Sequence, residues 1–285
     1  MTPRPDGVPD LSWLGEPIDA RPLFRPELAA LLDVLRALRP AEWSAPAVPG
    51  WSVRHLAAHI LGDYHGRLGR SAAGFEPVRA PGERLEAFIH RVNQEWIDRH
   101  AGHRPDALID ALEQAGARVS RRFETVDLGA GTTGVGVSWA GVDPAPKWLD
   151  TAREFTEYWT HRQQIRRATG RGTDPEPRAL STVLDTFMRA LPHTLRDVPA
   201  SVGTQVRVDV PGPGGGAWTV TATADRWSPA EAPRGRPAAS VELDPEAAWR
   251  LSTRGIDPGT ALALARVRGE RRLAEAVCRI VSIVY

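Results

Sequence analysis

The sequence predicts an α+β protein in which a helical part precedes a mixed part of helices and strands. From residue 25 to residue 170, apolar residues recur at the spacing of amphipathic helices. From residue 204 onward, short segments alternate apolar and polar residues, as half-buried strands do. A polar connection over 171–176 contains Gly and Pro and separates the two patterns. We therefore expect an irregular N-terminal arm over 1–20, a helical bundle over 21–172, and a helix plus a small α+β domain over 173–285.

The helical part begins with two well-delimited runs. The first helix is expected near Arg25, with Pro26 in its first turn, and Pro40 stops it. A loop closed by Pro49 and Gly50 follows. Ser52 then suits the N-cap of a second helix that reaches about residue 73, because a serine hydroxyl can accept a bond from a first-turn amide.

Three further runs complete the helical part. Apolar periodicity predicts helix over 83–100 and 106–126, and the Gly and Pro residues between them leave open two helices or one kinked helix. Residues 128–146 are rich in Gly and Thr and predict a long loop, a kind of segment that is often functional. A helix over 147–170 follows this loop directly.

The mixed part alternates helices with strands. Gly214 to Gly216 lack the Lys-Ser or Lys-Thr sequence of a phosphate-binding loop, so they predict the tip of a hairpin. The Asp-Pro pairs at 244–245 and 257–258 are typical helix starts. The expected elements are a helix over 178–195, strands over 204–210, 217–225 and 239–243, and helices from 245, from 258 to about 267, and from 270.

Composition indicates a protein of the cytoplasm. Of 285 residues, 42% are hydrophobic and 25% charged, as in soluble globular proteins. The net charge of +1 gives no overall attraction to nucleic acid or to an anionic membrane. We see neither an apolar run long enough to span a membrane nor a secretory leader. Cys278 is the only cysteine, which excludes an internal disulfide and fits a reducing compartment.

One pair of residues indicates metal chemistry. Glu157 and His161 lie four residues apart in the expected helix over 147–170, so they share one face. Such a pair can be an exposed charge pair, or it can hold one divalent ion with a further ligand. His59, in the second helix, is the candidate for that ligand. Two histidines and one glutamate would leave a coordination position open, as in catalytic zinc sites.

The two motifs together resemble a known family. The segment Pro49-Gly-Trp-Ser-Val-Arg-His-Leu-Ala-Ala-His59 is similar to the second helix of the DinB superfamily, and more narrowly of mycothiol-dependent maleylpyruvate isomerases. The run from Glu154 to Ile165 resembles the later Glu-x-x-x-His helix of that family. The resemblance covers about residues 25–170. It implies a DinB-like four-helix bundle with His59, Glu157 and His161 as metal ligands, followed by a smaller domain similar to sterol-carrier-type folds.

The resemblance also implies an enzyme that uses a thiol. A divalent metal, zinc by preference, would activate mycothiol or a similar low-molecular-weight thiol for S-transfer to, or isomerisation of, a small-molecule substrate. The same site could instead serve a metal-dependent hydrolase, or the bundle could be a non-catalytic module that binds a small molecule or a protein. The chain would act as a monomer or a homodimer, without nucleic acid or membrane partners.

Three further positions bear on this interpretation. Relatives often carry Asp three residues after the second histidine, where this chain has Gln164. His55 lies four residues before His59 and is a weaker candidate ligand. In the isomerase an arginine of the C-terminal domain is thought to hold substrate carboxylates, and Arg266 and Arg268 lie in the roughly corresponding region.

Overall fold

The computed structural model describes residues 11–69, 74–133, 136–174, 176–230 and 235–283. The chain divides into two compact units. The bundle unit comprises Arg21–Val126 and Glu157–Asp174, and the sheet unit comprises Met1–Ala20, Asp127–Thr156 and Pro175–Val284. The first half of the expected arm, residues 1–10, lies outside the described residues. The sequence-based domain boundaries at 20 and 172 stay a prediction.

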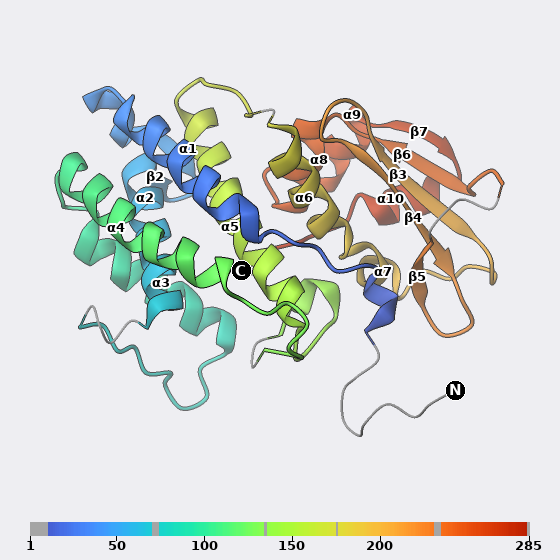
Figure 1. The fold of residues 1–285 in the computed structure, drawn as a ribbon. Helices are drawn as coiled ribbons and strands as arrows, with labels where there is room; N and C mark the ends of the chain where they lie inside the picture. The colour runs from blue at the N-terminus through green and yellow to red at the C-terminus, as the bar shows by residue number, and fades with distance from the viewer. Residues whose placement is uncertain (1–10, 70–73, 134–135, 175, 231–234, 284–285) are drawn as a thin grey trace. The chain divides into compact units, whose positions relative to one another are not determined.

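The bundle unit is built from the helices expected in the first part of the chain (Figure 1). The segments over 83–100 and 106–126 are two separate helices, which settles the question of a kinked one. The helices are α1 (Phe24–Arg36), α2 (Val53–Leu68), α3 (Leu85–His100), α4 (Pro105–Glu124) and, from Glu157 onward, α5 (Lys147–Ala168). Short 3₁₀ segments, η2 (Arg21–Leu23) and η3 (Pro40–Ser44), and a two-stranded ribbon of β1 (Pro46–Val48) and β2 (Trp51–Ser52) complete the unit.

Aromatic rings fill the centre of this unit. The rings of Phe24 on α1 and Phe123 on α4 stack with centroids 4.2 Å apart. Tyr158 on α5 meets Phe24 edge-on at 6.0 Å and Tyr64 on α2 at 4.8 Å. These contacts join four helices around one core. Each aromatic pair adds stabilisation beyond that from the buried area.

Two glycines let the bundle helices approach closely. A Cβ at Gly62 of α2 would lie 2.7 Å from a ring carbon of Trp96 on α3. A Cβ at Gly116 of α4 would lie 2.5 Å from Leu28 on α1. The Trp96 indole N–H donates to the carbonyl of Ala58 at 3.0 Å, which this close approach permits. Glycine inside a helix costs about 1 kcal/mol relative to alanine, and here the packing requires it.

The sheet unit contains a five-stranded sheet in the order β5-β4-β3-β6-β7. Strands β3 and β6 are parallel and the other neighbours antiparallel. Valines of β3, β4 and β6 are buried on one face, which α6 and α10 cover, and the alternate residues point to the other face. The strands are β3 (Gln205–Val210), β4 (Gly216–Ala222), β5 (Trp227–Ala230), β6 (Ala239–Glu242) and β7 (Arg266–Gly269).

Two helices of the sheet unit begin at the Asp-Pro pairs, as predicted. Asp244 and Asp257 each accept a bond from an amide of the following first turn. The helices are α6 (Pro177–Met188), α7 (Leu191–Leu195), α8 (Pro245–Ser252), α9 (Pro258–Leu264) and α10 (Arg271–Val277), with η1 (Ser12–Leu14) and η5 (Ser138–Ala140) in the unit's other segments. The α+β class is therefore confirmed. The likeness of this unit to sterol-carrier folds stays a prediction.

Some expected elements were wrong in detail. The helix expected to reach residue 267 ends at Leu264, and Arg266 and Arg268 lie on the edge strand β7. The helix expected over 178–195 is two helices, with Pro192 in the first turn of the second. Strand β5 was not predicted, and it contains Pro229, which is tolerated because β5 is an edge strand. The hairpin tip is confirmed, because β3 and β4 pair antiparallel and Val210 lies opposite Gly216.

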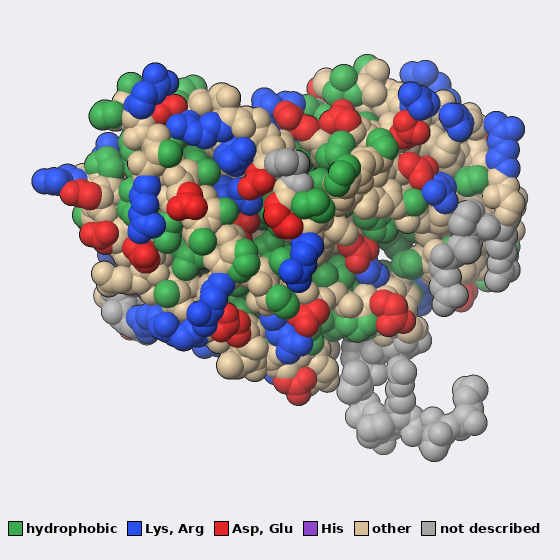
Figure 2. All heavy atoms as spheres, turned by 45° about the horizontal axis from the view of Figure 1, so that its top comes forward, with side chains coloured by type: hydrophobic (Ala, Val, Ile, Leu, Met, Phe, Trp, Pro, Cys, Tyr) green, Lys and Arg blue, Asp and Glu red, His purple; other side chains and the backbone are tan. Residues whose placement is uncertain are grey.

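Charge is mixed on the face of the molecule that Figure 2 draws. Lys and Arg side chains intermingle there with Asp and Glu side chains, in keeping with the net charge of +1. Within the described ranges, none of the helices combines the length with the apolar character of a membrane span.

Candidate metal centre

The candidate site is assembled from two helices of the bundle unit. Ser52 begins α2 by accepting a bond from the amide of His55, and His55 Nδ1 accepts one from the amide of Ser52. This reciprocal cap sets the helical phase that carries His59 inward. His55 therefore serves the helix start and does not belong to the cluster of candidate ligands.

Four potential ligands converge between α2 and α5. They are His59, Asp63, Glu157 and His161, and one donor atom of each lies within 4.8 Å of the donor atoms of the others. The imidazole rings of His59 and His161 meet edge-to-face with centroids 4.8 Å apart. The three residues expected from the sequence thus lie together in the structure, and Asp63 joins them.

The cluster consists of two matching pairs. His59 Nε2 lies 3.3 Å from Asp63 Oδ2 on α2, and His161 Nε2 lies 3.3 Å from Glu157 Oε1 on α5. Both pairs have the four-residue spacing that stacks side chains along a helix. Two ligand atoms about 2.0–2.2 Å from a tetrahedral zinc ion would be about 3.3–3.6 Å apart, so both separations suit zinc.

The orientation of His161 favours a cation. Its Nδ1 lies 2.8 Å from the Gln164 side-chain oxygen, which accepts, so Nδ1 carries the proton. The lone pair of a neutral ring then sits on Nε2, facing the Glu157 carboxylate. A lone pair and a carboxylate repel unless a proton or a metal ion lies between them. Zinc accepts both imidazole nitrogen and carboxylate oxygen, so these residues fit the ion that the resemblance implies.

The electrostatics of the site also favour a bound cation. Burial lowers the pKa of His161, but the hydrogen bond and charge of Glu157, the charge of Asp63 and the bond with Gln164 together raise it above its ordinary value. Two carboxylates beside two neutral imidazoles carry a charge of about −2. A divalent cation would neutralise that charge.

Two neighbouring residues support the ligands. Gln164 holds the outer nitrogen of His161, the arrangement by which a neighbouring acceptor usually orients a metal-bound histidine. The Trp51 ring lies 4.9 Å from the His59 ring, and its N–H donates to the Gln94 side chain at 3.1 Å. Trp159, in contrast, is fully buried in the core.

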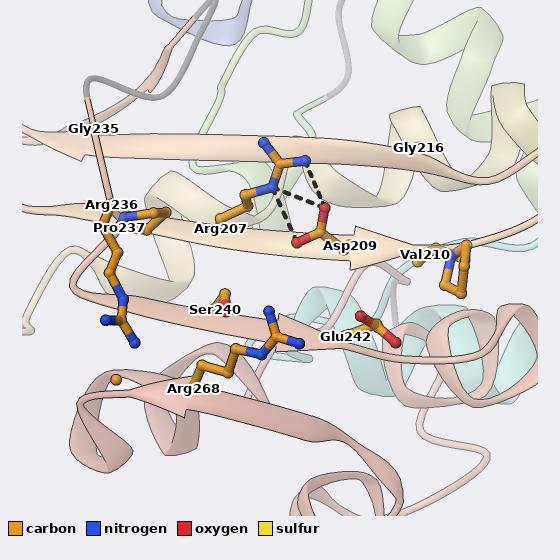
Figure 3. A pocket seen from close by; sticks show the side chains of 12 residues that line it. Arg207, Asp209, Val210, Gly216, Gly235, Arg236, Pro237, Ser240, Glu242 and Arg268 are labelled. Atoms are coloured by element: carbon orange, nitrogen blue, oxygen red, sulfur yellow. Dashed lines mark hydrogen bonds and ion pairs between the residues drawn. The ribbon is translucent and has the colours of Figure 1, made fainter.

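Sequence reasoning missed Asp63, although a signal was present. Asp63 follows His59 by four residues, the same spacing that singled out Glu157 and His161. Arg266 and Arg268, the expected substrate-carboxylate residues, belong to the sheet unit. Arg266 pairs with Glu242 at 3.0 Å, while Arg268 lines a groove on the sheet (Figure 3). Their role toward substrate stays a prediction.

Comparison with known proteins gives one family and two solved structures. The family described as mycothiol maleylpyruvate isomerase N-terminal domain matches residues 24–166, which include all four clustered residues. A histidine-to-alanine mutant of the mycothiol-dependent maleylpyruvate isomerase is 19% identical, with a TM-score of 0.50, 84% of this chain covered and 90% of that chain. Another structure of that isomerase has the same identity and coverage and a TM-score of 0.48.

At this identity the structural likeness concerns the fold. None of the curated proteins matches the chain. The family match spans just over half of the chain and contains both motifs from which the resemblance was drawn. The family is one of enzymes, and the expectation of an enzyme is confirmed at that level. The chain belongs to the mycothiol maleylpyruvate isomerase N-terminal domain family.

Proposed function

We propose that this protein is a metal-dependent enzyme that uses mycothiol or a similar thiol to transfer sulfur to, or isomerise, a small-molecule substrate. The observation that carries the proposal is the convergence of His59, Asp63, Glu157 and His161, with the lone pair of His161 directed at a carboxylate. When bound, a zinc-type ion would supply the positive charge that favours loss of a thiol proton near neutral pH.

The chain's own thiol does not suit the role of nucleophile. Cys278 is buried, and burial together with the nearby charge of Glu275 raises its pKa to about 11. A thiol with this pKa is almost entirely protonated near pH 7, so it is a poor nucleophile. A thiol-dependent reaction at the metal centre would therefore need a thiol from solution, which supports a low-molecular-weight co-substrate.

The protein residues would have distinct tasks. His59, Glu157 and His161 would hold the metal, and Gln164 would orient His161. Asp63 would be either a fourth metal ligand or a hydrogen-bond acceptor beside the open coordination position of the metal. Both tasks are possible because its carboxylate lies among the donor atoms of the cluster. An Asp63→Asn variant separates these tasks. Zinc affinity would fall at least tenfold if Asp63 is a ligand and would change little if it is not.

The first test measures metal content and thiol dependence together. Zinc per chain is determined for the wild type and for His161→Ala, and candidate substrates are then assayed with and without added thiol. We expect about one zinc per chain in the wild type, none in the variant, and turnover only when thiol is present. Turnover without thiol would favour a hydrolase. Failure of the wild type to take up zinc would overturn the proposal.

A further inference from the structure

Trp51 lies beside the candidate metal centre of the bundle unit, although it is not one of the four clustered residues. Its indole ring packs on the imidazole of His59, with ring centroids 4.9 Å apart and ring planes tilted by 47°. His59 is 6% exposed, whereas Trp51 is half-buried. A large aromatic side chain near the surface therefore contacts one of the candidate ligands directly.

The backbone of Trp51 is fixed on both sides. Before it, Pro49 and Gly50 form the two-residue turn between β1 and β2, and Val48 lies opposite Trp51 in the ribbon. Gly50 has a φ of 81°, which suits a glycine that follows proline in such a turn. After it, Ser52 caps α2. The indole therefore starts from a defined point at the first turn of the helix that carries His59.

A hydrogen-bond chain from α3 fixes the indole ring. The Trp51 N–H donates to Oε1 of Gln94 at 3.1 Å. The amide nitrogen of Gln94 donates to Oδ1 of Asp98 at 2.7 Å. Because an ionised carboxylate can only accept hydrogen bonds, Gln94 turns its NH₂ group to Asp98 and its oxygen to Trp51. Gln94 thus presents an acceptor of fixed orientation to the indole.

The packing of Trp51 restricts the rotation of the His59 ring. Nε2 of His59 lies 3.3 Å from Oδ2 of Asp63, so this nitrogen faces the cluster. Rotation of the ring about its bond to Cβ would move Nε2 away from the other donor atoms. This torsion has broad minima in histidine, so packing has to select one orientation. A tilted aromatic ring in contact with the imidazole supplies such packing.

We propose that Trp51 is a positioning residue of the metal centre, which holds the His59 ring in the orientation that binds metal, and that Gln94 anchors Trp51. The inference rests on the proposed function, because it gives His59 the task of a ligand. The two histidines are then oriented in different ways. Gln164 orients His161 by a hydrogen bond, and Trp51 holds His59 by ring packing. A residue on α3 outside the cluster thereby affects metal binding.

Titration of the full-length protein with Co²⁺ tests the inference. Co²⁺ is the probe because its visible absorption bands report the geometry of its ligands, and its affinity is measured by competition with a chromophoric chelator. We expect Trp51→Leu to shift the bands and to weaken Co²⁺ binding about tenfold or more, as the loss of a group that orients a ligand does. Trp51→Phe keeps an aromatic ring against His59 and should restore most of the affinity.

A double-mutant cycle tests the anchor. Trp51→Phe and Gln94→Leu remove the same hydrogen bond, so the double variant should lose no more affinity than the more affected single variant. Gln114→Leu is the matched control, because it replaces an exposed glutamine on α4. It should leave both the affinity and the absorption bands unchanged. Equal losses in Gln114→Leu and Gln94→Leu would overturn the assignment of Gln94 as the anchor.

NMR relaxation of the His59 ring carbons in the metal-free protein separates this inference from the proposed function. The signals are assigned by their absence in His59→Gln. We expect a lower order parameter for the ring in Trp51→Leu than in the wild type, because the ring becomes free to rotate. The inference is overturned if either this order parameter or the Co²⁺ binding of Trp51→Leu matches that of the wild type. A wild type that binds no metal, with the order parameter lowered in Trp51→Leu, would overturn the proposed function and still support the holding of His59 by Trp51.

Discussion

Two clusters of charged residues lie in the bundle unit, and in each of them carboxylates are balanced in a different way. In the first, Arg162 donates to Glu27 at 2.6 and 2.8 Å and to Asp174 at 2.6 Å. Its side chain is only 2% exposed, but a positive guanidinium faces both carboxylates directly. In the second, Asp63 and Glu157 face two imidazoles that are uncharged unless protonated.

The comparison shows how a structural cluster differs from a candidate binding site. An arginine stays charged at any pH that proteins tolerate, so both carboxylates of the Arg162 cluster face a permanent cation of the chain. The histidine cluster lacks a permanent cation among its own residues. It is balanced only by protons or by a metal ion, and this incompleteness makes it the candidate functional site.

The largest expected effect comes from removing the arginine of the Arg162 cluster. Arg162→Met leaves Glu27 buried without its partner, which should reduce the free energy of unfolding by about 3–5 kcal/mol in urea titrations. Arg36→Met is the matched control, because Arg36 pairs with Glu113 at the exposed surface. It should cost at most about 1 kcal/mol.

A double variant sharpens this prediction. Glu27→Leu combined with Arg162→Met replaces a buried ion pair by apolar side chains, so it should be more stable than Arg162→Met alone. Equal losses in Arg162→Met and Arg36→Met would contradict the view that this cluster is a closed structural ion pair.

Zinc binding to the histidine cluster should have the next largest effect on stability. Zinc at a free concentration about one hundred times its Kd should raise the free energy of unfolding by about 2.7 kcal/mol, because only the folded chain assembles the site. His161→Ala should abolish this increase, and His90→Ala, which removes an exposed histidine, should retain it. An increase that survives in His161→Ala would place the zinc elsewhere.

A smaller effect is expected from the residue that orients His161. Gln164→Leu removes the acceptor for Nδ1–H and should weaken zinc binding about 10- to 100-fold, measured by competition with a chromophoric chelator. Gln164→Glu has nearly the same shape and keeps an acceptor, so its affinity should match or exceed that of the wild type. Similar affinities for Gln164→Leu and wild type would show that the contact does not support the metal.

The smallest effect concerns a half-buried ion pair of the same unit. Hydrogen bonds from Arg171 and Arg39 lower the pKa of Glu42 from 4.5 to about 2. A lowered folded-state pKa contributes stability that is present above about pH 4.5 and is lost as the pH falls toward 2. Glu42→Gln should therefore flatten the dependence of the urea midpoint on pH between 5 and 2. An unchanged slope would assign acid sensitivity to other groups.

Local signals explain how much of the fold could be anticipated. Ser52 starts α2 and the Asp-Pro pairs start α8 and α9 because a cap acts within one helical turn. The first two residues of β7 were mistaken for helix because the strand's pairing partner is β6, and no pattern within four residues reveals such a partner.

Part of the candidate metal centre was equally local. Glu157 and His161 share a helical face at a spacing that can be read directly from the chain. Asp63 stands at the same spacing from His59, but a second carboxylate is informative only when the two helices are seen to meet. The pairing of Arg162 with Glu27 spans 135 positions, and spacing alone could not predict it.

The sequence by itself determined the α+β class, most helix starts, the family resemblance and three of the four clustered residues. These depend on periodicity, capping and short motifs, which act over a few residues. Only the tertiary structure decided that the pair of His59 and Asp63 on α2 meets the pair of Glu157 and His161 on α5, and that Arg162 reaches Glu27. Such contacts arise from packing between segments distant in the chain, where separation in sequence carries no information about distance in space.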